Sequence, residues 1–145
     1  MANYNIAYNK VIKVEGGYVN DSDDAGGETY MGISRKFNPN AKFWKVIDEI
    51  KSINKNITNK EMNAILKKNN SIIGEIKNIY KNKYWDKLYL DNLNSQKIAE
   101  ELFDTAVNMG VSVAIKILQN SLRVKTDGKM TNDLIKQINE RRFIY

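Results

Sequence analysis

Apolar residues recur at every third or fourth position along most of this chain, which is the spacing of amphipathic helices. The first such pattern consists of Tyr4, Tyr8, Val11 and Ile12. It predicts a helix over about residues 3 to 15, which the following pair Gly16-Gly17 would end.

The next stretch is rich in glycine and acidic residues, and it has few apolar residues before Met31. Tyr18-Val19 lies on one side of its Asp- and Gly-rich centre, and Glu28-Thr29-Tyr30 lies on the other. Such flanks around turn-forming residues predict a small β-hairpin or an extended loop.

Helical patterns resume after the turn that contains the only proline, Pro39. Thr58 and Glu61 fit a capping box at the start of one helix. Gly110 would end another helix, and Ser112 would cap the one after it. The apolar positions of these helices are Phe43, Ile47 and Ile50; Met62, Ile65 and Leu66; Ile72, Ile76, Ile79, Tyr80 and Tyr84; Ile98, Leu102, Ala106 and Met109; Ile115, Leu118 and Leu122; and Leu134, Ile135 and Ile138. The predicted fold class is mostly α, with a small β-hairpin or loop after the first helix.

Length and composition fit a soluble domain with a hydrophobic core. The chain has 145 residues, of which 42% are hydrophobic and 28% are charged. Tyr84 and Trp85 follow an apolar helical stripe and are expected in that core. The best candidate for a membrane span, Val111 to Leu118, is short and contains Lys116, so we expect no membrane insertion. We expect a monomer.

Two residue types are absent, and their absence restricts the possible chemistry. The chain has no cysteine, which excludes disulfides, thiolate nucleophiles and cysteine metal sites. It has no histidine, which excludes Ser-His-Asp catalysis and the usual zinc sites. Any catalysis must therefore use carboxylates, Lys, Tyr, Ser or Thr, or a hard metal bound by oxygen ligands.

The net charge of +6 favours a polyanionic partner, such as nucleic acid, an anionic membrane surface or bacterial cell wall. Lysines spread along a chain, however, usually form an ordinary solvated surface. A basic helical nucleic-acid-binding protein would explain the charge but not the acidic, glycine-rich stretch.

Glu15 is the first candidate for catalysis, because it lies at the predicted C-terminal end of the first helix. The negative end of the helix dipole disfavours an ionised carboxylate there, typically by ~0.3–1 kcal/mol. Desolvation in a cleft would act in the same direction and keep the acid protonated near neutral pH. Cleavage of a glycosidic bond requires such a proton-donating acid. Gly16 and Gly17 would let a polymer approach the neighbouring backbone.

A second carboxylate would then stabilise the developing positive charge or activate a water molecule. The acids within reach of a hairpin that folds back over the helix end are Asp21, Asp23, Asp24 and Glu28. Asp24 comes nine residues after Glu15, and Thr29 comes fourteen residues after it. The residues alone do not choose among these acids.

The same acidic stretch has some features of a calcium-binding EF-hand loop. With Asp21 as the first ligand, Asp23 occupies the third position and Gly26 the sixth. The fifth position is then Ala25 and the twelfth is Gly32, so two required ligands are missing. An EF-hand is excluded and no metal site is predicted, although a weakly held, oxygen-ligated ion stays open.

Several motifs resemble one family in matching order along most of the chain. They are "EGGYVND", "DDAGGETYMGIS", "NKYWDKL", "ELFDTAVNMGVSVAIKILQNSL", "TDGKMTNDLI" and "NERRFIY". This set is similar to glycoside hydrolase family 108, a group of lysozyme-like N-acetylmuramidases. Residues 101–122 and the motif after them resemble the family's C-terminal predicted peptidoglycan-binding segment. The resemblance implies a lysozyme-like catalytic region over residues 1–93 and a helical peptidoglycan-binding segment over residues 94–145, packed into the same globular unit.

The resemblance also implies roles for particular residues. The glutamate of the Glu-Gly-Gly-Tyr motif is regarded as the catalytic acid of the family, and here it is Glu15. The order Glu15, Asp24, Thr29 resembles that of phage-type lysozymes. By this analogy Asp24 would position or activate water with help from the Thr29 hydroxyl.

Four further residues are candidates for substrate binding: Gly16, Gly17, Tyr18 and Asn108. Gly16, Gly17 and Tyr18 belong to the same motif as Glu15. The Tyr18 ring would either stack on a sugar or seal the hairpin. Asn108 would either reach a substrate N-acetyl group or cap the end of its helix.

The sequence thus predicts an enzyme that cleaves the β-1,4 bond between N-acetylmuramic acid and N-acetylglucosamine in bacterial peptidoglycan. No cofactor and no nucleic-acid partner are implied. The alternative is a non-catalytic wall-binding protein with a lysozyme-like fold. The start of the chain has no secretory pattern. We therefore expect synthesis in the bacterial cytoplasm and action in the periplasm or cell wall after holin-type or dedicated release.

Overall fold

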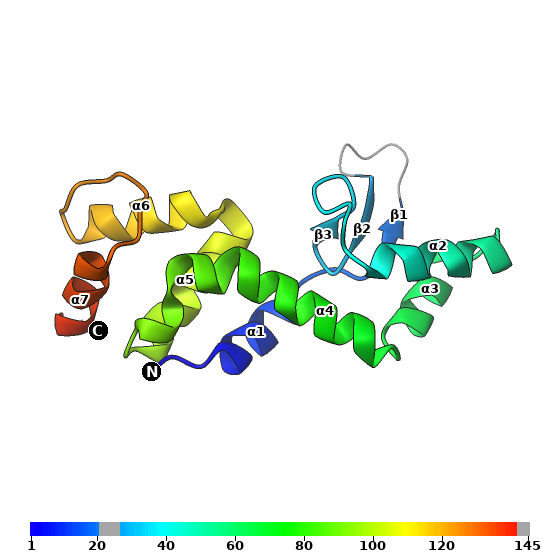
Figure 1. The fold of residues 1–145 in the computed structure, drawn as a ribbon, viewed down its shortest axis with the longest axis horizontal. Helices are drawn as coiled ribbons and strands as arrows, with labels where there is room; N and C mark the ends of the chain where they lie inside the picture. Colours follow the sequence, from blue (N-terminus) through cyan, green and yellow to red (C-terminus); the bar gives the residue numbers. More distant parts are fainter. Residues whose placement is uncertain (21–26, 142–145) are drawn as a thin grey trace. The chain divides into compact units, whose positions relative to one another are not determined.

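Helices form most of the chain in the computed structural model, which describes residues 1–20 and 27–141 (Figure 1). A small antiparallel sheet follows the first helix, so the predicted fold class is confirmed. The chain divides into two units, one made of residues 12–78 and the other of residues 1–11 with the chain from residue 79 onward. Within the described ranges, no helix is both long enough and apolar enough to span a bilayer.

The sheet of the first of these units, residues 12–78, has three short strands. They are β1 (Val19–Asn20), β2 (Glu28–Tyr30) and β3 (Ile33–Ser34), hydrogen-bonded in the order β1-β2-β3. Val19 lies opposite Thr29, and Tyr30 lies opposite Ile33. The two residues between β2 and β3 are Met31 and Gly32, and both have positive φ, as a tight two-residue hairpin turn requires.

Three helices complete this unit: α2 (Phe43–Ile53), α3 (Asn59–Leu66) and α4 (Asn70–Tyr80), whose last residues belong to the other unit. The buried side chains of α2 and α3 are Phe43, Trp44, Ile47, Met62 and Leu66. The predicted cap is confirmed, because the Glu61 backbone N–H donates to Thr58 Oγ1 at 3.1 Å. The Tyr30 ring from the sheet packs edge-on against Phe43, with centroids 6.0 Å apart.

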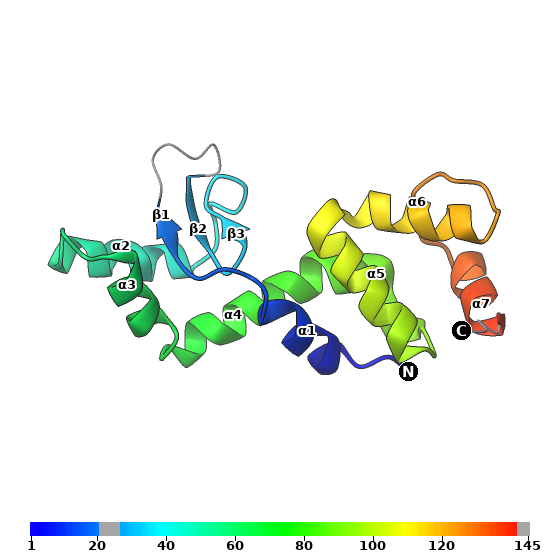
Figure 2. The same cartoon turned by 180° about the vertical axis from the view of Figure 1, so that it is seen from behind.

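The second unit contains α1 (Tyr4–Ile12) without its last residue, α5 (Gln96–Met109), α6 (Val111–Ser121) and α7 (Asn132–Glu140), all seen from behind in Figure 2. A π-helical turn, η1 (Lys81–Trp85), and two 3-10 turns, η2 (Asp86–Leu88) and η3 (Leu90–Asn92), join α4 to α5. Tyr4, Trp85 and Phe103 pack edge-on with centroids 5.3–5.7 Å apart. Trp85 is fully buried, which confirms its predicted place in the core.

Three details of the sequence prediction are corrected. The first helix ends at Ile12 rather than near residue 15, because the amphipathic pattern ends there and Val14 is exposed. Ser112 does not cap α6, which begins at Val111 directly after Gly110. Strand β3 was not predicted, because its two residues are too few to form a pattern. The boundaries between the two units lie within α1 and α4. The predicted boundary between a catalytic region and a peptidoglycan-binding segment lies elsewhere, at residue 93, and it stays a prediction.

Candidate functional site

Glu15 lies in a bend three residues beyond the end of α1, and its side chain is half-buried. Glu15 therefore does not lie at the helix end, where the sequence analysis placed it. Glu15 is followed directly by Gly16, Gly17 and Tyr18, which connect it to strand β1.

The two glycines after Glu15 have different surroundings. A Cβ added to Gly16 would meet no atom of residues 1–20 or 27–141 within 4 Å, so none of these residues closes this side of the backbone. A Cβ added to Gly17 would collide with the side-chain amide of Asn63, at 2.8 Å from Cγ and 2.9 Å from Nδ2. The missing side chain at Gly17 thus makes room for a protein contact, whereas the space beside Gly16 is compatible with an approaching ligand.

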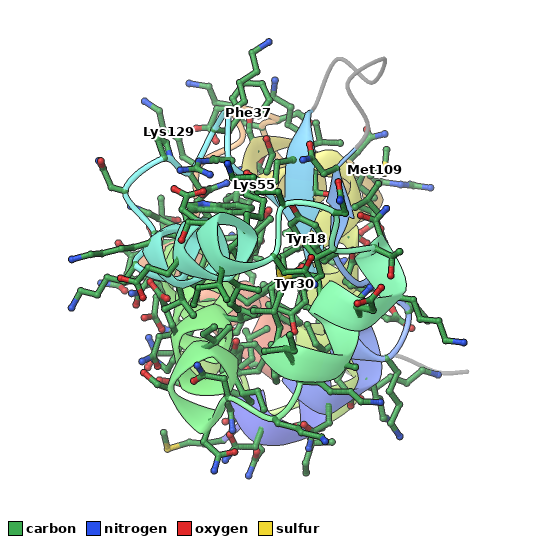
Figure 3. The ribbon with its side chains drawn as sticks, turned by 90° about the vertical axis from the view of Figure 1, so that its right-hand side faces the viewer. Tyr18, Tyr30, Phe37, Lys55, Met109 and Lys129 are labelled. Atoms are coloured by element: carbon green, nitrogen blue, oxygen red, sulfur yellow. The ribbon has the colours of Figure 1, made fainter. Side chains whose placement is uncertain are left out.

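Tyr18 is held through both its backbone and its ring. Its backbone N–H donates to Asn63 Oδ1 at 2.5 Å, and its carbonyl accepts from Asn63 Nδ2 at 3.3 Å. Its hydroxyl donates to Glu28 Oε2. The side chain is only 3% exposed and lies inside the unit with Tyr30, whereas Phe37 lies at the surface (Figure 3). These contacts favour the alternative in which Tyr18 seals the sheet rather than stacks on a sugar.

Glu28 is the centre of an ion cluster that joins β2 to α2. Its carboxylate, in a side chain that is 9% exposed, accepts from Arg35 Nη1 and from Lys51 Nζ, each at 2.8 Å, as well as from Tyr18. Arg35 also binds Asp48 through two bonds of 2.6 and 2.7 Å. Burial alone would raise the pKa of Glu28, but the hydrogen bonds from Lys51, Tyr18 and Arg35 outweigh it and lower the pKa below its usual value.

The ionised Glu28 in turn affects Tyr18. Burial raises the pKa of the Tyr18 phenol, and the hydrogen bond to Glu28 raises it further. Tyr18 is therefore a neutral donor at physiological pH. Because Glu28 is held in its charged form by three donors, it is unsuited to protonate a substrate and acts as an anchor between β2 and α2.

The remaining predicted site residues are placed as follows. Thr29 is half-buried in β2, opposite Val19 of β1. Asp24, like Asp21 and Asp23, lies outside the described residues, so its role stays a prediction. Asn108 is exposed on α5 in the other unit.

Asn108 bonds within its own helix. Its Nδ2 donates to the Asp104 carbonyl at 2.9 Å and to Asp104 Oδ1 at 3.3 Å. This geometry favours the alternative in which Asn108 supports the end of α5. Within residues 1–20 and 27–141 no group of three or more acidic side chains is arranged to hold a metal ion.

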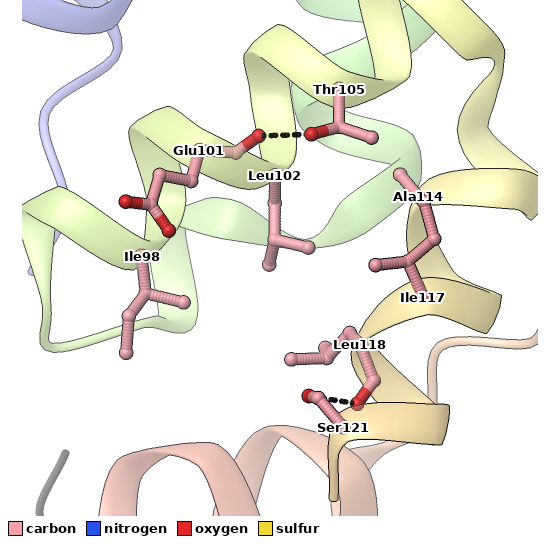
Figure 4. A pocket seen from close by; sticks show the side chains of 8 residues that line it. All are labelled: Ile98, Glu101, Leu102, Thr105, Ala114, Ile117, Leu118 and Ser121. Atoms are coloured by element: carbon pink, nitrogen blue, oxygen red, sulfur yellow. Dashed lines mark hydrogen bonds between the residues drawn. The ribbon is translucent and has the colours of Figure 1, made fainter.

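An apolar pocket of about 300 Å³ lies between α5 and α6 (Figure 4). Side chains from both helices point into it, among them Leu102 and Leu118. Its hydroxyl groups are occupied by their own helices, since Thr105 donates to the Glu101 carbonyl and Ser121 to the Leu118 carbonyl. The pocket contains none of the predicted site residues.

Sequence reasoning missed Asn63, Arg35 and Lys51, the residues that hold Tyr18 and Glu28. Only Asn63 gives a local signal, because asparagine is unfavourable inside a helix unless its side chain is used elsewhere. Arg35 and Lys51 look like any other surface cations in a lysine-rich chain.

The family model described as Glycosyl hydrolase 108 matches residues 8–110, which is most of the chain and includes Glu15 and its motif. The chain belongs to glycosyl hydrolase family 108. As a member of that family, the protein is a glycoside hydrolase. The match ends at Gly110, so a peptidoglycan-binding role for the helices beyond it stays a prediction.

A solved structure, that of Brucella abortus SagA, is similar to this family 108 protein with a TM-score of 0.63. The two sequences are 25% identical, and the similarity covers 96% of this chain and 70% of that chain. The comparison with curated proteins gave no match.

Proposed function

We propose that this family 108 protein hydrolyses the β-1,4 bond between N-acetylmuramic acid and N-acetylglucosamine in bacterial peptidoglycan. The observation that carries the proposal is the family match over residues 8–110, because it includes the Glu-Gly-Gly-Tyr motif at residues 15–18. The net charge of +6 is compatible with an anionic wall substrate. Action would take place in the periplasm or cell wall.

In this proposal Glu15 is the general acid that protonates the glycosidic oxygen. Two features support it. Its side chain is not fully buried, and no described residue closes the backbone at the adjacent Gly16 to an approaching chain. Glu28, the other described acid of the segment, is committed to Arg35 and Lys51 and has a lowered pKa, so it is a poor proton donor.

Asp24 would complete the reaction by activating a water molecule or stabilising the oxocarbenium-like centre, with help from the Thr29 hydroxyl. Support for this part is the order of residues in the sequence together with the place of Thr29 in β2, next to the anchored Glu28. The distance between the Glu15 and Asp24 carboxyl groups would decide the stereochemistry: about 5–5.5 Å for retention and roughly 6.5–9.5 Å for inversion.

The test is Glu15→Gln, assayed on purified peptidoglycan by the release of reducing ends and by mass spectrometry of the muropeptides. We expect the loss of nearly all hydrolysis, because glutamine cannot donate the proton, with unchanged thermal unfolding. Glu49→Gln is the matched control, since Glu49 is an exposed glutamate of α2, and it should retain full activity.

The outcomes separate the proposal from its alternative. Wild-type activity in Glu15→Gln would remove Glu15 from the mechanism. Binding of the wild-type protein to insoluble peptidoglycan without any new reducing ends would instead indicate a wall-binding protein that does not cut.

A further inference from the structure

Asn63 makes an unusual contact for a residue in the middle of a helix. Both atoms of its side-chain amide bond the backbone of Tyr18, 45 residues earlier: Oδ1 accepts from the Tyr18 N–H at 2.5 Å, and Nδ2 donates to the Tyr18 carbonyl at 3.3 Å. One amide thus satisfies both main-chain polar groups of a buried residue that lies between Glu15 and β1.

Gly17 makes this contact possible. Its φ is not in the positive range, so its backbone conformation is open to any residue. A side chain at this position would displace the Asn63 amide, because a Cβ would overlap it. The need for glycine at position 17 therefore comes from the close approach of Asn63 rather than from the turn.

The rest of α3 makes Asn63 a rigid support. The neighbouring helix positions Met62 and Leu66 are fully buried, and Thr58 caps the first turn. Asparagine lowers helix propensity relative to alanine, so the helix alone does not account for its presence. Its contribution lies in the contact with the segment after Glu15.

We propose that Asn63 is a positioning residue for catalysis: its amide clamps the backbone of Tyr18 and thereby fixes the Glu15–Tyr18 segment that carries the general acid. The inference rests on the proposed function. A catalytic acid must be held to within a fraction of an ångström of its productive position, and a displacement of about 1 Å can lower the rate by about 100-fold. The Glu28 bond fixes the far end of Tyr18, and Asn63 fixes its main chain.

The experiment is a double-variant cycle with Gly17→Ala, Asn63→Ala and the two combined, assayed for kcat and KM on soluble glycan strands of peptidoglycan. Each single variant should lower kcat about 10-fold or more while KM changes less than about twofold, because positioning affects the reacting bond more than binding. In the combined variant kcat should fall little further, since the three atoms nearest to a Cβ at Gly17 all belong to the Asn63 amide, which Asn63→Ala removes.

Two matched control variants show whether an alanine substitution at an exposed helix position changes kcat by itself. Gly74→Ala and Asn78→Ala both lie on exposed positions of α4, and a Cβ at Gly74 has open space around it. Both should retain wild-type kcat. Asn63→Asp keeps the acceptor for the Tyr18 N–H and loses the donor to its carbonyl, so its kcat should lie between those of the wild type and Asn63→Ala. Circular dichroism and thermal unfolding would show that every variant is folded at the assay temperature.

The results distinguish the two proposals. If the wild type releases no reducing ends, the proposed hydrolysis is refuted, and the catalytic role of Asn63 is refuted with it. If the wild type is active and Asn63→Ala keeps its kcat within twofold, only the positioning role is refuted. Independent losses that multiply in the combined variant would also refute it, because they would show that Gly17 and Asn63 do not act through one contact.

Discussion

Replacing Glu28 by glutamine tests whether the ion cluster between β2 and α2 stabilises the unit. We expect the variant to lose about 2 kcal/mol of unfolding free energy at neutral pH. The substitution preserves size and one acceptor oxygen, which can still bond the Tyr18 hydroxyl. It removes the negative charge, and with the oxygen facing Tyr18 and Lys51 kept, it places an NH₂ group where Arg35 now donates.

The magnitude follows from the exposure of the partners. Removing one member of a fully buried ion pair typically costs about 3–5 kcal/mol, and an exposed pair contributes about 0–1 kcal/mol. Glu28 is 9% exposed, but the side chains of Arg35 and Lys51 are 36% and 33% exposed, so water can solvate both cations in the variant. Arg35 also keeps its two bonds to Asp48. The expected loss therefore lies between the two limits, at about 2 kcal/mol.

The same cluster predicts how stability depends on pH. The pKa of Glu28 is lower in the folded protein than in the unfolded chain, so the folded state holds its proton less tightly. Its stabilising contribution is present above the unfolded value of about 4.3 and is lost as the pH falls through the folded pKa. The pKa of Asp48 is lowered too, chiefly by its hydrogen bond from Arg35. Below about pH 4 the wild type should thus lose stability more steeply than Glu28→Gln.

Urea unfolding at pH 7 and at several values between pH 3 and 5, followed by circular dichroism, measures both effects. Asp48→Asn is the matched control, because Asp48 belongs to the same cluster but its side chain is 46% exposed, and it should cost less than about 1 kcal/mol. An unchanged unfolding free energy in Glu28→Gln, or equal acid sensitivity of wild type and variant, would show that the charge of Glu28 does not stabilise the folded protein.

Two further substitutions test local features of each unit. Thr58→Ala removes the acceptor for the Glu61 N–H at the start of α3 and should lower the unfolding free energy by about 1 kcal/mol in the same urea assay. Gln119→Leu, in the other unit, leaves the Gly128 N–H without its buried acceptor and removes the Gln119 donor to Asp127, which keeps the Lys129 N–H, so we expect a loss of about 1–3 kcal/mol. A stability equal to that of the wild type would contradict the assigned bond in either case.

The elements that the sequence predicts well are those formed by local interactions. The helices α2 to α7 follow the apolar spacing of the chain, and the Thr58 cap depends on residues three positions apart. The strands β1 and β2 were predicted from their flanking residues, whereas the two-residue β3 and the Met31-Gly32 turn gave no such pattern. The end of α1 was placed too late, because Gly16 and Gly17 suggested a stop signal that the helix does not reach.

The contacts that organise the candidate site were not predictable in the same way. Tyr18 and Asn63 are 45 residues apart, and Glu28 and Lys51 are 23 apart. No local spacing relates such residues, since their meeting depends on how β1, β2, α2 and α3 fold together. The sequence therefore identified the segment that carries Glu15, but it assigned the two glycines to the substrate alone and left Tyr18 open between a sugar contact and sealing of the hairpin.

Asn63 and Gly17 are each unfavourable in their local structure, and this indicates that another contact requires them. Asn63 weakens the interior of α3, and Gly17 costs conformational entropy at a position with ordinary φ. Either residue alone would be a small defect, but together they form one contact that fixes the backbone beside Glu15. Residues that break a local rule are expected where function constrains a sequence. A pair that breaks two rules for one shared contact is a stronger indication of a constrained site than a motif of one glutamate and two glycines.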